Sequence, residues 1–162
     1  MNTATHDLIA ARQKFTKFPV RQILNVTQLS TGIKNDCYGN AHATKDAAAA
    51  TGKKTYIVSG WIVCAYDPIQ NGTAIIQHWW NVDDQGNHFD TTPNLNPDSI
   101  YVQDTGLYVF CCDNDATLLT HLGNNLWHNN GKFEVLIDTN LMLFTPVDEL
   151  KTERFIPLLV EP

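Results

Sequence analysis

The feature that most constrains the fold is a succession of β-branched and aromatic segments separated by turn sequences. Strands are predicted over 55–66 (TYIVSGWIVCAY), 73–82 (TAIIQHWWNV) and 87–91 (NHFDT). Turns are predicted at the Asp-Pro and Asn-Gly pairs, 67–68 and 71–72, and at the DDQG sequence, 83–86. Because short turns join strands that run antiparallel, these segments predict an antiparallel sheet.

A first helix is predicted near the start of the chain. It covers residues 7–17 (DLIAARQKFTK), and Pro19 ends the pattern. The apolar side of this helix is formed by Leu8, Ile9, Ala11 and Phe15. The next segment, 20–29 (VRQILNVTQL), fits either a short helix or a strand.

A second helix is predicted between the N-cap candidates Asn35 and Asp36 and the stop residue Gly52. Its sequence, CYGNAHATKDAAAAT, is rich in alanine, which suits close packing against a sheet. Gly39 opposes the helix by about 1 kcal/mol relative to alanine. Cys37 is therefore expected at or near the helix N-terminus.

The rest of the chain is expected to complete the sheet. Further strands are predicted over 106–112 (GLYVFCC), 132–138 (KFEVLID) and 154–160 (RFIPLLV), with a mostly polar loop over 124–131. Helices followed by a run of antiparallel strands predict an α+β fold. A length of 162 residues suits one domain, 1–162.

Composition limits the function classes. The formal net charge is −6 and the pI about 5.3, which argues against nucleic acid or anionic membranes as partners. No apolar run approaches the roughly 20 residues of a membrane span, and residues 1–10 do not resemble a secretory signal. Among the four cysteines no Cys-x-x-Cys pair occurs, so reduced thiols in a cytoplasm are expected. The cysteines are Cys37, Cys64, Cys111 and Cys112.

Cys37, His78 and Asp90 together indicate thiol chemistry. A helix N-terminus can stabilise a Cys37 thiolate, although Asp36 opposes this unless its side chain caps the helix. A histidine can take the thiol proton, and a carboxylate can orient the imidazole. A three-residue turn centred on Asp84 would place His78 directly opposite Asp90, about 5 Å apart at Cβ. Each residue alone also fits a structural role, as a buried thiol, a satisfied histidine or a loop cap.

The stretch HWWNVDDQGNHFDTTP, residues 78–93, resembles the signature of transglutaminase-like enzymes, which belong to the papain-like cysteine enzymes. In that family a His followed by an aromatic opens one strand, and an apolar-Asp-x-Thr/Pro element closes the next. Gly60-Trp61 is similar to the Gly-aromatic pair of the family's preceding strand. Cys37-Tyr38 is similar to the Cys-aromatic pair that begins its helix.

The resemblance implies a papain-like or transglutaminase-like α+β fold, with the nucleophile at a helix N-terminus packed on an antiparallel sheet. Its catalytic elements lie in 33–93, and 94–162 would complete the sheet. By resemblance, Cys37 is the nucleophile, His78 the base and Asp90 the orienting carboxylate.

The oxyanion donor departs from the family pattern. The family often has a Gln before the Cys, where this chain has Asn35 and Asp36. The amide of Asn35 or Asn40 is a candidate donor beside the backbone N–H of Cys37. The family branch with zinc-binding Cys-x-x-Cys pairs is disfavoured. The candidate walls of a substrate cleft are Trp61, Trp80 and His88. For the two tryptophans, core packing is the alternative.

Other histidines leave alternatives open. His88 shares a strand face with Asp90 and competes with His78 for the base role. A metal site built from these three residues and Cys37 is a further alternative, although no compact ligand motif supports it and no cofactor is expected. We expect exposed positions for His42, His121 and His128, and we expect His42 to face away from Cys37.

Two function classes follow. The first is an enzyme that acts on a peptide, protein or small amide through a Cys37 thioester, released to water or to an amine, with hydrolysis as the default. The second is a binding or interaction protein on the same scaffold with a decayed triad. An enzyme of the first class could also act inside a host cell, as a toxin-like or phage-borne modifier of a host protein.

Overall fold

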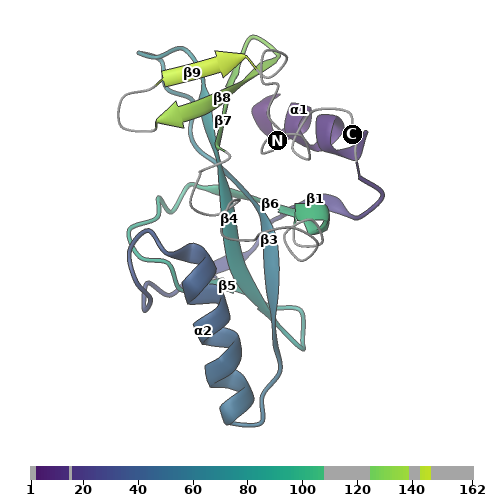
Figure 1. Ribbon diagram of the computed structural model, residues 1–162, viewed down its shortest axis with the longest axis vertical. Coiled ribbons are helices and arrows are strands. Elements are labelled where there is room, and N and C mark those ends of the chain that lie inside the picture. Colours follow the sequence, from purple (N-terminus) through teal and green to yellow (C-terminus); the bar gives the residue numbers. More distant parts are fainter. Residues whose placement is uncertain (1–2, 15, 108–124, 139–142, 147–162) are drawn as a thin grey trace.

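The structure is a computed structural model that describes residues 3–14, 16–107, 125–138 and 143–146. They form an α+β arrangement of helices on a curled, mostly antiparallel sheet (Figure 1). The helices are α1 (Thr3–Gln13) and α2 (Cys37–Ala50). The strands are β1 (Val20–Ile23), β2 (Val26–Gln28), β3 (Thr55–Val63), β4 (Thr73–Asp83), β5 (His88–Asp90), β6 (Ile100–Asp104), β7 (Asn125–Asn129), β8 (Lys132–Asp138) and β9 (Leu143–Pro146).

The central strands are β3 and β4, which pair antiparallel over the whole of β3 and residues 75–83 of β4, with Gly60 opposite His78. The strand order is β1-β6-β3-β4-β7-β8-β9, and β5 also pairs with β4 and, in parallel, with β2. Only glycine fits at position 60, because a Cβ there would lie 2.0 Å from the Val102 carbonyl oxygen and 2.8 Å from the Trp80 ring. The sheet is therefore closely packed beside His78.

The outer edge of β4 is paired at its two ends. At one end residues 73–75 pair with β7, and at the other Asn81 and Val82 pair with β5. Between them, residues 76–80 have no strand partner on this side among the described residues. Figure 1 shows α2 running alongside β4, with its N-terminal end toward the middle of the strand.

The largest core cluster lies between α1 and the sheet and is built around Leu8, Trp61 and Ile75, each 0% exposed. A buried ion pair crosses the same region, because Arg12 Nε donates to Asp104 Oδ2 at 2.5 Å. The Trp61 indole N–H donates to the same carboxylate at 3.0 Å. These contacts hold α1 against β6 and β3.

The second helix begins where its caps predict. The Asp36 carboxylate accepts the Gly39 N–H at 3.2 Å, and Gly52 follows the helix with a φ of +74°. A Cβ on Gly39 would lie 2.3 Å from Asp36 Oδ2. The glycine that weakens the helix intrinsically is thus the residue that leaves room for the cap.

Several predictions of local structure need correction. The first helix spans 3–13 instead of 7–17, and the ambiguous segment 20–29 contains β1 and β2. The prediction of a loop over 124–131 is wrong, because this segment contains strand β7. The prediction that a strand begins at residue 106 is also wrong, because residues 105–107 are helical.

The remaining predictions divide between confirmed elements and undescribed residues. The strands predicted in the 55–91 region and over 132–138 are confirmed within a few residues at their ends. The strand predicted over 154–160 lies outside the described residues. No helix in the described ranges is long and apolar enough to cross a membrane.

Candidate active site

His78 and Asp90 form a buried pair between β4 and β5. His78 Nε2 lies 2.6 Å from Asp90 Oδ2, and the two residues are 3% and 1% exposed. The contact between them is the one that the sequence predicts, but the predicted register is wrong. The β4–β5 ladder pairs Asn81 with Phe89 and Val82 with His88, which puts Trp80 opposite Asp90.

His78 is consequently diagonal to Asp90 and not directly across from it. A shift of two residues keeps His78 on the same face of the sheet, so the side chains still meet. The turn still has three residues but is centred on Gln85 instead of Asp84, because the Asp83 N–H donates to the Asn87 carbonyl at 3.0 Å. The Asp83 carboxylate supports this turn by accepting the N–H groups of Gln85 and Asn87, each at 2.9 Å.

Cys37 completes a series of three residues that runs through His78 to Asp90. It is the first residue of α2, half-buried, and packs against Trp79 and Ala41. Its thiol lies close enough to the His78 imidazole to raise the pKa of that imidazole. Because His78 Nε2 is engaged by Asp90, Nδ1 is the ring nitrogen that remains for the thiol.

Asp90 is fixed by more than His78. Its Oδ2 also accepts the Tyr101 hydroxyl at 2.8 Å, and its Oδ1 accepts the Thr92 backbone N–H at 2.9 Å. Gln28 Nε2 donates to the Tyr101 oxygen at 3.3 Å. The carboxylate thus has three hydrogen bonds that hold it in one orientation.

Sequence reasoning missed these partners of Asp90. Thr92 carried a usable signal, since an aspartate commonly accepts the N–H two residues later. Tyr101 and Gln28 carried none, because they reach Asp90 through the pairing of β6 with β3 and of β2 with β5.

The electrostatics of the pair favour a charged imidazole. Burial, the largest influence on His78, lowers its pKa, but hydrogen bonds with Asp90 and Cys37 oppose it and raise the pKa to about 9. Burial raises the pKa of Asp90, yet its bonds with His78, Thr92 and Tyr101 hold that pKa below its usual value. At neutral pH the site therefore holds an imidazolium and a carboxylate.

The candidate oxyanion amides are placed differently. Asn40 is 6% exposed, and its amide binds the backbone of Ile33 through Oδ1 at 2.7 Å and Nδ2 at 2.8 Å. Asn35 is exposed, with a φ of +60°. Asn40 therefore fixes the loop that leads into α2, and among the described residues no hydrogen bond joins either amide to Cys37.

A buried amide that the sequence did not single out belongs to Gln77, the residue that precedes His78 on β4. Gln77 is 7% exposed, and neither Nε2 nor Oε1 has a hydrogen-bond partner in the described part of the chain. An unpaired buried polar group of this kind costs about 1–3 kcal/mol. The backbone N–H of Gln77 is engaged, donating to Asn125 Oδ1 at 3.1 Å.

The candidate cleft walls have mixed positions. Trp61 and Trp80 are 0% and 1% exposed, so both are core residues and present no surface to a substrate. His88 is half-buried, and its Nδ1 accepts the Trp80 indole N–H at 3.0 Å. The His88 Nδ1 atom is therefore already engaged, in a contact that involves neither Cys37 nor Asp90. Within the described ranges, no three His, Cys, Asp or Glu side chains gather as a metal site would require.

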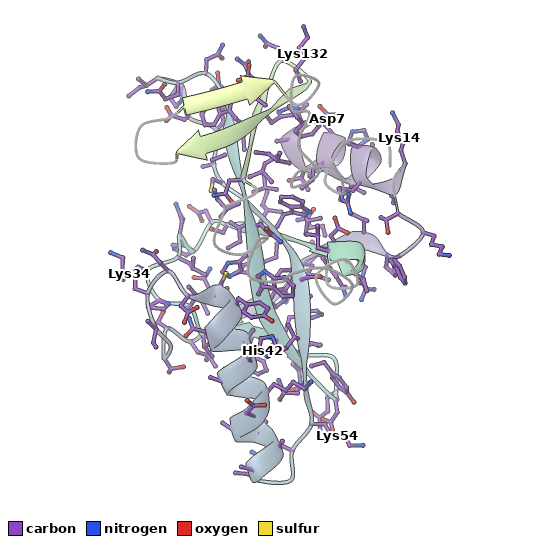
Figure 2. All side chains as sticks on the ribbon, viewed as in Figure 1. Asp7, Lys14, Lys34, His42, Lys54 and Lys132 are labelled. Carbon is purple, nitrogen blue, oxygen red and sulfur yellow. The ribbon has the colours of Figure 1, made fainter. Side chains whose placement is uncertain are left out.

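Two of the histidines expected at the surface are not exposed. His42, labelled on α2 in Figure 2, is half-buried. Its ring centroid lies 4.3 Å from that of Tyr38, and burial lowers its pKa. His128 is 6% exposed and lies in β7, with Nε2 2.7 Å from Asp7 Oδ2. His121 lies outside the described residues.

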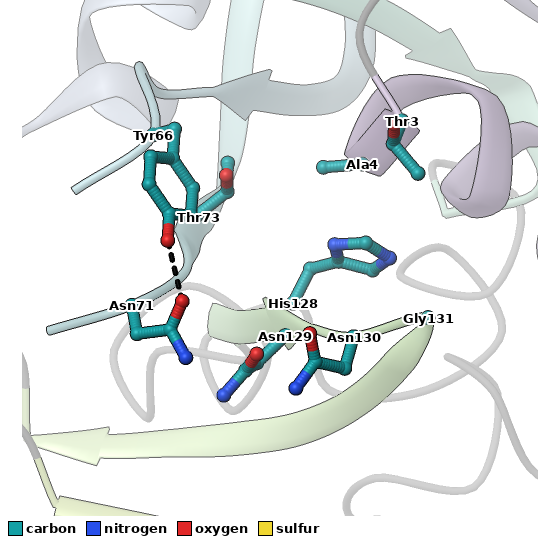
Figure 3. A pocket seen from close by; sticks show the side chains of 9 residues that line it. All are labelled: Thr3, Ala4, Tyr66, Asn71, Thr73, His128, Asn129, Asn130 and Gly131. Carbon is teal, nitrogen blue, oxygen red and sulfur yellow. Dashed lines mark hydrogen bonds between the residues drawn. The ribbon is translucent and has the colours of Figure 1, made fainter. Parts of the chain in front are cut away.

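His128 also lines a polar pocket of about 440 Å³, which Figure 3 shows from close by. In it the Tyr66 hydroxyl donates to the Asn71 side chain. The lining residues are Thr3, Ala4, Tyr66, Asn71, Thr73, His128, Asn129, Asn130 and Gly131. None of the three residues Cys37, His78 and Asp90 belongs to this pocket.

Comparisons with known proteins add no relative. No protein-family model matches the chain, and no curated protein or solved structure matches it.

Proposed function

We propose that this chain is a cysteine-dependent enzyme that cleaves or transfers an acyl group, with Cys37 as nucleophile, His78 as acid and base, and Asp90 as the carboxylate that orients His78. The observation that carries the proposal is the unbroken series of contacts from the Cys37 thiol through His78 to Asp90. On this proposal the α+β fold is of the papain-like or transglutaminase-like kind, with the nucleophile at the start of α2.

The electrostatics support this role for each group. His78 lies next to the thiol and can exchange a proton with it, and the deprotonated thiol is the form that attacks an acyl carbon. The N-terminus of α2 adds partial positive charge at Cys37. The competing negative charge of Asp36 is directed to the Gly39 N–H, where it caps the helix.

The reaction proceeds through a thioester. Attack of the Cys37 thiolate forms the Sγ–C bond and moves the carbonyl π electrons onto oxygen. Collapse of this intermediate breaks the bond to the leaving amine, which takes the proton from His78. Water then gives a proton to His78 as it attacks the thioester, and the acid leaves with Cys37 regenerated.

Hydrolysis of a peptide, protein or small amide is the default outcome, and an amine in place of water gives transfer. A rival function is a binding protein on the same scaffold. The engagement of Asn40 with Ile33 favours this rival, because it removes one candidate oxyanion donor.

Thiol reactivity tests the proposal against its rival. Iodoacetamide at pH 7 should alkylate Cys37 ahead of Cys64, whose pKa is raised by burial, with the sites read by peptide mass spectrometry. Wild-type chain should also form an acyl-enzyme with p-nitrophenyl acetate, and Cys37→Ala should not. Equal, slow labelling of every cysteine together with no acyl-enzyme would favour the binding protein.

A further inference from the structure

We propose that the side-chain amide of Gln77 is the second oxyanion donor of the site, acting beside the backbone N–H of Cys37. This inference rests on the proposed function. It concerns a residue that the resemblance to papain-like enzymes does not mark, since those enzymes often place a Gln before the Cys and not before the His.

The position of Gln77 follows from how β4 and α2 pack. On one face of β4, Asn81 Nδ2 donates to the Ala41 carbonyl at 3.0 Å, and Trp79 packs against Cys37 and Ala41. Two strand residues advance about 6.8 Å, and four helix residues advance about 6 Å. The step from Asn81 to Trp79 thus matches the step from Ala41 to Cys37.

One further step of two residues along β4 leads from Trp79 to Gln77. Because Trp79 already lies at the level of Cys37, we infer that Gln77 lies beyond the first turn of α2, in front of the helix N-terminus. The same stretch of β4, residues 76–80, lacks a strand partner on its outer side among the described residues. Among the described residues, β7 reaches this stretch only through Asn125, whose Oδ1 accepts the backbone N–H of Gln77 at 3.1 Å and leaves the side-chain amide of Gln77 unbound.

The state of the Gln77 amide supports the assignment. It is more than nine-tenths buried, and both of its polar atoms are without a partner in the described residues. The carbonyl oxygen of the substrate becomes negatively charged only in the tetrahedral intermediate, and it would then accept a hydrogen bond from Gln77 Nε2. The Cys37 N–H, at the first position of a helix, has no acceptor within the helix and supplies the other donor.

Preorganised donors of this kind act on the intermediate more than on the ground state. Removing one oxyanion donor lowers a rate by about 10²–10³-fold. Alkylation by iodoacetamide provides the contrast, because displacement of iodide by the thiolate creates no oxyanion on the reagent.

The experiment compares these two reactions at Cys37 in Gln77→Met and Gln77→Glu. Single-turnover release of p-nitrophenolate from p-nitrophenyl acetate measures acylation, and intact mass measures alkylation. Acylation should fall by about 10²–10³-fold in Gln77→Met and further in Gln77→Glu. Alkylation should stay within about threefold of wild type in Gln77→Met. The matched control is Gln70→Met, a change at an exposed turn residue, which should leave both rates unchanged.

Three results would overturn the assignment. Unchanged acylation in Gln77→Met shows that its amide is not a donor. An equal loss of acylation and alkylation shows that Gln77 only holds Cys37 or His78 in place. Absence of acylation in the wild-type chain, with Cys37 still selectively alkylated, defeats the proposed function and this inference together.

Discussion

Two buried histidines of this protein each contact an aspartate with almost the same geometry. The distance from Nε2 to the carboxylate is 2.6 Å for His78 and Asp90, and 2.7 Å for His128 and Asp7. The surroundings differ. The Asp90 side chain is 1% exposed and accepts two further hydrogen bonds, whereas the Asp7 side chain is 29% exposed.

The difference separates a candidate catalytic pair from a structural one. His78 has a thiol as its other neighbour, and burial makes its pairing with Asp90 strong. His128 instead joins β7 to α1 beside a pocket that no cysteine of the described residues lines. A His–Asp contact therefore becomes a candidate active site only when a nucleophile and a buried orienting network accompany it.

The largest expected effect is on activity. His78→Gln should slow acylation of Cys37 by about 10²–10⁴-fold, because the general acid and base is lost. His128→Gln, the matched change in the other pair, should leave the rate within about threefold. Single-turnover acylation by p-nitrophenyl acetate measures both. Similar losses in the two variants would contradict the distinction between the pairs.

The next effect is on stability. Asp90→Asn should lower the free energy of unfolding by about 3–5 kcal/mol, because it leaves a buried imidazolium without its charged partner. Asp7→Asn should cost about 0.5 kcal/mol, because solvent screens that pair. Urea denaturation followed by tryptophan fluorescence measures both changes, and a smaller loss in Asp90→Asn than in Asp7→Asn would refute the ranking.

The pH dependence of stability should follow His78. Its folded-state pKa of about 9 lies above the unfolded value of 6.5, so its contribution is complete below pH 6.5 and disappears as the pH rises through 9. The free energy of unfolding should fall by up to about 3 kcal/mol over this window. His78→Gln should flatten this part of the profile. An unchanged slope in His78→Gln would show that another group is responsible.

The smallest effect concerns Tyr101, which shares Asp90 Oδ2 with His78. Tyr101→Phe should lower the free energy of unfolding by about 1.5 kcal/mol, through loss of a hydrogen bond to a charged group. The remaining charge on Asp90 should then hold the His78 proton more tightly and raise the pKa of His78. An NMR titration of the imidazole measures that pKa, and a fall would reverse the role assigned to Tyr101.

Local sequence signals determined the elements that carry the candidate site. The caps at Asp36 and Gly52 defined α2 and placed Cys37 at its start, and the DDQG turn, 83–86, defined the β4–β5 hairpin. Because strand side chains alternate with a period of two, His78 and Asp90 stayed on one face even though the predicted register was two residues off.

Tertiary structure alone decided the rest. Strand β7 was missed because its polar ends resemble a loop, and only its pairing with β4 buries Leu126 and Trp127. The partners of Asp90 and the position of Gln77 likewise depend on strands and a helix that come from distant parts of the chain. Such contacts leave no local pattern, because the energy that fixes them comes from burial and pairing between segments far apart in the sequence.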